Sequence, residues 1–116
     1  MSKKVLWFSR HEMTPDQRAA LGPNVTINQV NKTIQSAYEL KDEVEESDII
    51  AIVAPTNIQQ QFLKLAGDKP VIMAVNDRVL VKQPDGSEDK VEFHFVKWIR
   101  LVRIEVVKED YVPEDL

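Results

Sequence analysis

The sequence contains no cysteine among its 116 residues. Disulfide bridges, thiolate zinc sites and cysteine nucleophiles are therefore excluded, and a reducing compartment is compatible with the composition. Without covalent or metal cross-links, each half of the chain would be too small to be stable by itself, whereas 116 residues suffice for one hydrophobic core. We therefore expect residues 1–116 to form a single domain.

Glycine occurs only three times and histidine only twice. The chain has no P-loop, no GxGxxG fingerprint and no GxSxG nucleophile elbow, so ATP hydrolysis and classical dinucleotide binding are not expected. The two histidines lie far apart in the sequence, and the carboxylates cluster on a predicted helix and hairpin rather than at ligand spacing. The sequence therefore predicts neither a metal site nor a cofactor.

Long apolar runs and an excess of positive charge are also missing. No segment approaches the roughly 20 apolar residues that span a bilayer, and the apolar run Val5–Phe8 is shorter than the roughly 7–15 residues of a signal-peptide core. We expect a cytoplasmic protein with no membrane partner. The net charge of −4 argues against long nucleic acid as a partner, while helix N-termini still allow a small anionic ligand.

Apolar strands alternate with capped helices along the first two thirds of the chain. Strands are predicted at Val5–Ser9, Val25–Val30, Asp48–Ala54 and Val71–Val75. The unbroken apolar runs at residues 49–54 and 71–75 are typical of parallel strands covered on both faces, whereas Val25–Val30 alternates apolar and polar residues. The pattern predicts an α/β, Rossmann-like three-layer domain whose mostly parallel central sheet has the first, third and fourth strands inside.

Three helices are predicted between these strands. The first begins at Thr14, where a Thr-Pro-x-Gln pattern gives a capping box, and ends before Gly22. The second runs from Ile34 to the acidic run at residues 43–46, whose charge opposes the helix macrodipole. The third begins at Thr56, which with Gln59 repeats the capping pattern, and it ends at Gly67.

The last third of the chain reads as a C-terminal β-hairpin extension. Its predicted strands are Arg78–Lys82 and Val91–Val107, joined by a turn at Gln83–Ser87. Within the second strand the apolar residues change from odd to even positions, which predicts a bulge or bend near residues 97–101. Residues 110–116 are expected to form a loose tail.

The aromatic residues of this hairpin indicate self-association. Phe93, Phe95 and Trp98 add more apolar area than a peripheral hairpin needs. We therefore expect part of this surface to form a homodimer interface.

Polar segments follow three of the predicted parallel strands, at the edge where open α/β sheets bind ligands. Arg10 can hold a phosphate with two hydrogen bonds, and His11 can transfer protons near neutral pH, so these two are the catalytic candidates. The candidate ligand-binding residues are Ser9, Thr14, Thr56, Asn57, Asn76 and Arg78.

Plainer interpretations stay open for several of these residues. Thr14 and Thr56 are expected first of all to be helix caps. Asn76 can equally belong to a turn between strands. His94, on the polar face of a late strand, is interpreted as structural.

The order and spacing of these elements resemble the small CRISPR-associated, CARF-like ring nucleases. Ser9–Gln17 is similar to the Ser-His-x-Leu-Thr-x-x-Gln-like motif after their first strand, with one residue more, and Val53–Asn57 matches their third strand and helix start. Their last strands and hairpin are matched by the stretch that runs from Val71 through Arg78 and Asp85-Gly86 to Trp98.

The resemblance implies that the chain binds a cyclic oligoadenylate, or another small phosphate-bearing ligand, across the two-fold axis of a homodimer. It further implies cleavage by metal-independent attack of a ribose 2′-hydroxyl on its neighbouring phosphate. A non-catalytic module that binds a nucleotide or a protein is the alternative.

Overall fold

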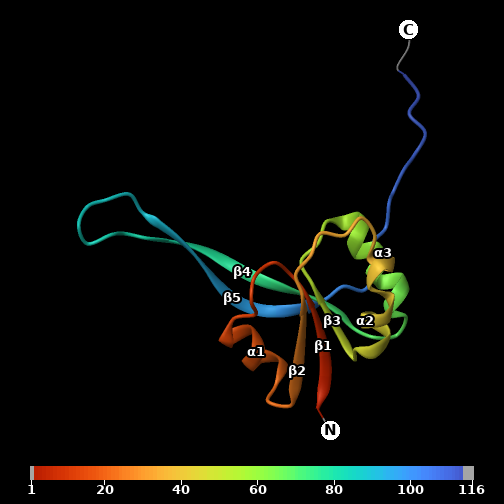
Figure 1. The fold of residues 1–116 in the computed structure, drawn as a ribbon. Coiled ribbons are helices and arrows are strands. Elements are labelled where there is room, and N and C mark those ends of the chain that lie inside the picture. Colours follow the sequence, from red (N-terminus) through yellow and green to blue (C-terminus); the bar gives the residue numbers. More distant parts are fainter. Residues whose placement is uncertain (1, 114–116) are drawn as a thin grey trace.

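The computed structural model of the chain describes residues 2–113. A five-stranded sheet with the order β2-β1-β3-β4-β5 forms its centre (Figure 1). The strands are β1 (Lys3–Phe8), β2 (Val25–Val30), β3 (Ile49–Ile52), β4 (Val71–Val81) and β5 (Lys90–Arg100). The first four are parallel, and β5 is antiparallel to β4. The predicted α/β class, the mostly parallel sheet and the inner positions of β1, β3 and β4 are confirmed.

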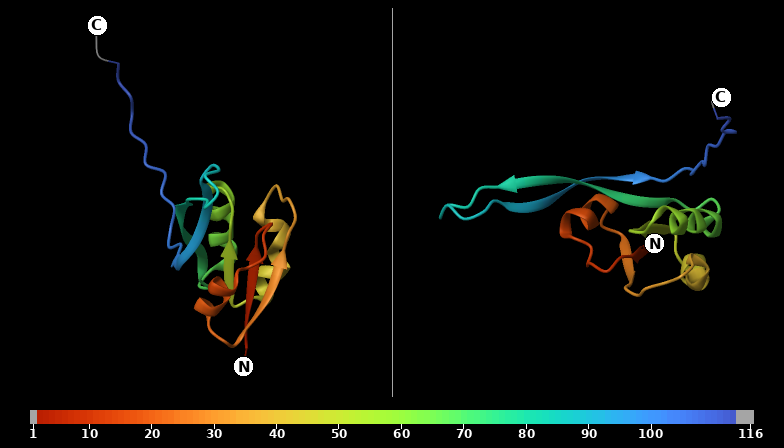
Figure 2. Two further views of the ribbon diagram at one scale, coloured as in Figure 1. Left: turned by 90° about the vertical axis from the view of Figure 1, so that its left-hand side faces the viewer. Right: turned by 90° about the horizontal axis from the view of Figure 1, so that it is seen from above.

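Helices cover both faces of this sheet. They are α1 (Pro15–Leu21), the short 3-10 helix η1 (Ala37–Leu40), α2 (Lys41–Glu46) and α3 (Thr56–Ala66). Along β1 the side chains alternate, so Leu6 packs in the cluster formed with η1, α2 and α3, whereas Val5 and Trp7 pack in the cluster that includes Leu21 of α1. Figure 2 shows the helices and sheet from two further sides. Within residues 2–113, no helix has the length and apolar character needed to cross a membrane.

Two of the predicted helix starts differ from the structure. Helical structure begins at Ala37, capped by Ser36, rather than at Ile34, because the first turn is a 3-10 helix held by its own capping box. The expected cap at Thr56 is wrong: Pro55 occupies the N-cap position, and the side-chain amide of Gln59 donates to the Ala54 carbonyl oxygen at 2.7 Å.

Beyond the body, β4 and β5 form a long two-stranded ribbon (Figures 1 and 2). Only Val71 and Ile72 of β4 pair with β3, whereas residues 76–81 pair with β5 alone. We call the paired residues 76–81 and 90–95, with the turn between them, the arm. A register shift leaves Val96 as an extra residue, one position before the range predicted for the bulge.

The structure corrects the predicted boundaries of this hairpin. Asn76 and Asp77 are not a turn, because β4 continues through them without interruption. The last strand ends at Arg100 instead of Val107, because β4 offers no further partner once Leu101 has donated its amide hydrogen to the Val71 carbonyl. Of the predicted loose tail, residues 110–113 belong to no helix or strand, and residues 114–116 lie outside the described part.

Candidate functional site

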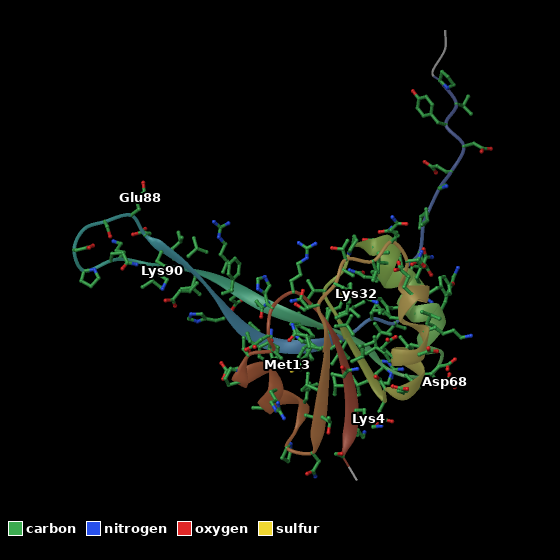
Figure 3. The ribbon with its side chains drawn as sticks, in the orientation of Figure 1. Lys4, Met13, Lys32, Asp68, Glu88 and Lys90 are labelled. Atoms are coloured by element: carbon green, nitrogen blue, oxygen red, sulfur yellow. The ribbon has the colours of Figure 1, made fainter. Side chains whose placement is uncertain are left out.

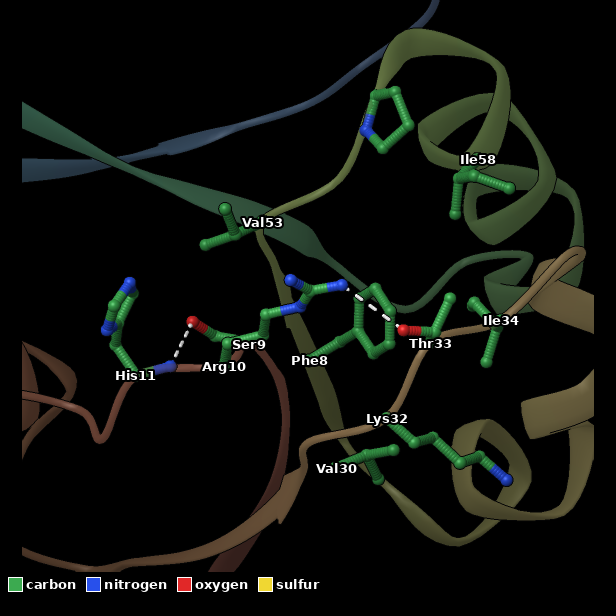
Figure 4. A pocket seen from close by; sticks show the side chains of 11 residues that line it. Phe8, Ser9, Arg10, His11, Val30, Lys32, Thr33, Ile34, Val53 and Ile58 are labelled. Atoms are coloured by element: carbon green, nitrogen blue, oxygen red, sulfur yellow. Dashed lines mark hydrogen bonds between the residues drawn. The ribbon is translucent and has the colours of Figure 1, made fainter.

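The sheet has a topological switch point between β1 and β3. The chain moves from β1 outward to β2, and then crosses to the other side of β1 to form β3. At such a point the loops after the two inner strands diverge and leave a crevice at the carboxyl edge. A cavity of about 360 Å³ lies there, and we call it the switch-point pocket (Figure 4).

Hydrogen bonds hold the loop after β1 in place beside this pocket. The Trp7 indole donates to the His11 carbonyl oxygen at 2.8 Å, and the Gln29 amide donates to the carbonyl oxygens of Ser9 (3.0 Å) and His11 (3.1 Å). Ser9 is buried, and its hydroxyl accepts the His11 amide hydrogen at 3.1 Å. Gln29 is not among the site residues predicted from the sequence, where a glutamine on an otherwise apolar side of an edge strand is its only signal.

Two cationic side chains line the switch-point pocket, and within residues 2–113 neither Asp nor Glu is among its lining residues. The Arg10 guanidinium reaches across the pocket and donates to the Thr33 hydroxyl at 3.2 Å. The second cation, Lys32, comes from the loop after β2, and in Figure 4 its side chain extends away from Arg10. Phe8 and Ile58 add apolar surface. The pocket therefore combines positive charge with an apolar wall.

A second hollow of about 330 Å³ lies on the other side of the same loop. It shares Ser9, His11 and Val53 with the switch-point pocket and is also lined by Thr14 and Asn76. Thr14 forms the predicted capping box: its hydroxyl accepts the Gln17 amide hydrogen at 3.2 Å, and the Gln17 side chain accepts that of Thr14 at 3.0 Å. Five of the candidate site residues thus lie around one loop.

The remaining candidates lie elsewhere. Thr56 and Asn57 occupy the exposed first turn of α3, and Arg78 is exposed in the arm opposite Phe93; none of the three lines either hollow. The reason for the position of Arg78 is that β4 passes the sheet edge as part of the arm instead of turning at it.

His94 also lies in the arm, far along the strand from the pocket loop. One of its ring nitrogens lies 2.9 Å from a Glu92 carboxylate oxygen, and this hydrogen bond lowers the pKa of Glu92. Within residues 2–113, no three His, Asp or Glu side chains gather as metal ligands do.

Lys32 and Thr33 are pocket residues that sequence reasoning missed. They follow β2, and the sequence does not show that β2 lies directly beside β1 with its carboxyl end at the same edge.

No family model matches the chain, and no curated protein or solved structure matches it either.

Proposed function

We propose that the switch-point pocket binds a small phosphate-bearing ligand, and that a cyclic oligoadenylate is its ligand class. The observation that carries this proposal is the charge of the pocket: among residues 2–113, Arg10 and Lys32 line it and no carboxylate does, in a chain whose net charge is −4. A local cluster of cations in an acidic protein attracts anions to that one place. Guanidinium groups in particular bind phosphate with two parallel hydrogen bonds.

The pocket offers each part of a nucleotide a suitable surface. Arg10 would bind one oxygen of the phosphate and would release its hydrogen bond to Thr33 or share it with the ligand. Lys32 would turn toward another oxygen of the same phosphate. Phe8 and Ile58 would contact the base or sugar. A cavity of about 360 Å³ is at the small end of the range for ligand pockets, so one nucleotide unit would enter it. The rest of a ring would lie over the neighbouring hollow, beyond Ser9 and His11.

Cleavage of the ring is the second part of the proposal. A ribose 2′-hydroxyl would attack the adjacent phosphorus, forming a 2′,3′-cyclic phosphate while the bond to the 5′-oxygen breaks. His11 would take or supply the transferred proton, and Arg10 would stabilise the charge that develops on the phosphate. The remaining task of the protein is to align the hydroxyl with the phosphate. We also propose that the domain is Rossmann-like and that the protein is located in the cytoplasm.

A binding assay tests the first part. We expect calorimetric titration to show binding of cyclic tetra-adenylate and weaker binding of adenosine monophosphate, while adenosine, which lacks phosphate, does not bind. Equal affinity for adenosine and adenosine monophosphate would contradict a phosphate site.

Chromatography of the cyclic ligand after incubation with the protein tests the second part. Linear products that carry a cyclic phosphate support cleavage, whereas an intact ring restricts the function to binding.

A further inference from the structure

One face of the arm is mostly apolar and exposed, and it also carries Asn76 and Arg78. Side chains opposite each other in an antiparallel pair lie on the same face, so Leu80 and Val91 share a face with Phe93 and Phe95. Phe93 is 71% exposed and Leu80 is 63% exposed. Figure 3 shows the arm extending beyond the body toward Glu88 at its end. Because a two-stranded ribbon is at best marginally stable in water, an arm with this face requires further covering.

The segment after β5 has the pattern of a strand without a partner. Residues 101–107, which we call the tail segment, belong to no strand, and Val102 and Val106 are 78% and 70% exposed. Apolar β-branched residues at even positions alternate with Arg103 and Glu105. Such alternation is typical of a half-buried strand, and β-branched residues favour that conformation.

The tail segment has no route to the edge of its own β5. A hairpin would need turn residues, and there is no Gly, Pro, Asn or Asp anywhere from residue 96 to residue 109. Parallel pairing would need a crossover connection, whereas the tail segment follows β5 directly. Within residues 2–113, β5 pairs with β4 alone, so its outer edge is open to a strand from another chain.

We propose that two copies of the chain associate antiparallel along β5, so that each tail segment pairs with the arm of the partner. With the two-fold axis at Trp98, the extra residue Val96 shifts the pairing by one, so beyond this bulge an odd-numbered residue of one chain faces an even-numbered residue of the other. The apolar residues lie at odd positions before the bulge and at even positions after it. This register therefore brings apolar residues together, and the facing positions are 93 with 102, and 91 with 104.

The charges select the same register. Glu92 faces the partner's Arg103, and Lys90 faces the partner's Glu105, so both pairs have opposite signs. A shift of two residues in one direction places Lys90 opposite Arg103, and a shift in the other direction places Glu92 opposite Glu105. Like charges directly opposite each other destabilise a strand pair. Only the proposed register of the three avoids such a contact.

In the proposed dimer each arm becomes a three-stranded sheet with a mostly apolar face, and three strands are the number that an independent sheet needs. The dimer is isologous, because the same residues contribute from both copies. Since β3 and β4 separate β5 from β1, each copy keeps its own switch-point pocket. One ligand would therefore not be shared across this axis, in contrast to what the family resemblance implies.

Charge reversal tests the register through the oligomeric state. In sedimentation velocity, the parent chain is expected to be a dimer, while R103E and E92R each weaken dimerisation by about tenfold or more. An equimolar mixture of the two variants is expected to recover the dimer, because a heterodimer has both opposite-charge pairs. K108E, with the same charge change outside the paired residues, is the control and should stay dimeric.

Changes within one chain, such as the loss of the Arg103–Glu105 ion pair, cannot explain why a mixture of the two variants recovers the dimer. A monomeric parent at tens of micromolar, unchanged dimers of both variants, or failure of the mixture to recover would each overturn the proposal. A second measurement uses the absence of cysteine: F93C/V102C should give a disulfide-linked dimer on oxidation, and V91C/V102C, which is out of register, should not. Neither readout involves the ligand.

Discussion

Lys69 shows how one side chain compensates an unfavourable local charge pattern. The acidic residues near the end of α2 oppose the helix macrodipole, whose negative end lies there. The Lys69 ammonium donates to the carbonyl oxygens of Val44 at 2.9 Å and Glu45 at 2.8 Å, so it binds carbonyl groups at the helix end and supplies a positive charge at the same place.

We expect K69M to lower the free energy of unfolding by about 1–2 kcal/mol, because charge-assisted hydrogen bonds at a partly buried position are lost. Urea unfolding measures the difference. K64M removes an exposed lysine from the last turn of α3 and is the control, with a much smaller expected effect. Equal stability losses in the two variants would show that Lys69 contributes no more than an ordinary surface charge.

Arg10 is the residue on which the proposed ligand site depends most. R10A should weaken binding of cyclic tetra-adenylate by about 1.5–3 kcal/mol, the range for a hydrogen bond to a charged group. R18A, which removes an exposed arginine of α1 outside both hollows, should leave the affinity unchanged. Titration calorimetry compares the two, and an R10A variant that binds like the parent would exclude the switch-point pocket as the phosphate site.

His11 separates binding from turnover. Its imidazole is exposed at the junction of the two hollows, while its backbone is held by Trp7 and Gln29. H11A should therefore keep most of the affinity and slow cleavage about 10²-fold or more, as expected for the loss of a general acid or base. Single-turnover chromatography measures the rate. If cleavage by H11A matches that of the parent, proton transfer is performed by another group.

At the scale of elements, η1 depends on Glu39. Its carboxylate accepts the amide hydrogens of Gln35 at 2.8 Å and Ser36 at 3.1 Å, and these bonds lower the pKa of Glu39 below its ordinary value of 4.5. Two buried residues of η1, Ala37 and Leu40, belong to the larger core cluster. The cap therefore fixes the point at which the chain enters the core.

The lowered pKa predicts how the cap responds to pH. A carboxyl group whose folded-state pKa lies below its unfolded value stabilises the fold above the unfolded value, and this stabilisation is lost as the pH falls through the folded value. The parent should therefore be more stable than E39Q above about pH 4.5 and should lose that advantage in more acidic solution. Thermal unfolding across this range measures the difference. E45Q is the control, and a constant difference between parent and E39Q would contradict the assignment.

At the scale of the whole molecule, the body and the arm are separable. Neither core cluster contains a residue from 77 to 94, and the aromatic contacts of the body end at Phe95, whose ring packs 5.6 Å from that of Trp98. Asn76 pairs directly with Phe95, so the two strands are already adjacent where the body ends.

A chain in which Asn-Gly replaces residues 77–94 should therefore fold, because this dipeptide is the preferred two-residue hairpin turn. We expect cooperative unfolding with the ligand affinity of the parent, and a monomer, since the partner surface of the arm is gone. Circular dichroism, calorimetry and sedimentation measure the three properties. An unfolded product would show that the arm stabilises the body, and a product that stays dimeric would place the interface elsewhere.

Features that depend only on neighbouring residues can be predicted from the amino-acid sequence. The apolar run at residues 49–54 and the capping box at Thr14 are local patterns, and both elements are present. The change of apolar phase in the last strand predicted a bulge that lies at Val96. The polar loop after β1 is likewise evident from the sequence, and its residues line the switch-point pocket at the carboxyl edge of the sheet.

Contacts between residues far apart in the sequence depend on the tertiary structure. The pairing of β1 with both β2 and β3 brings Thr33 to Arg10, and no local pattern encodes that order of strands. The same holds for Gln29, which holds the loop from a neighbouring strand, and for Arg78, which the continuing β4 carries into the arm. Local backbone preferences are encoded within a few residues, whereas the strand order and the pocket result from burying separate apolar segments against one another.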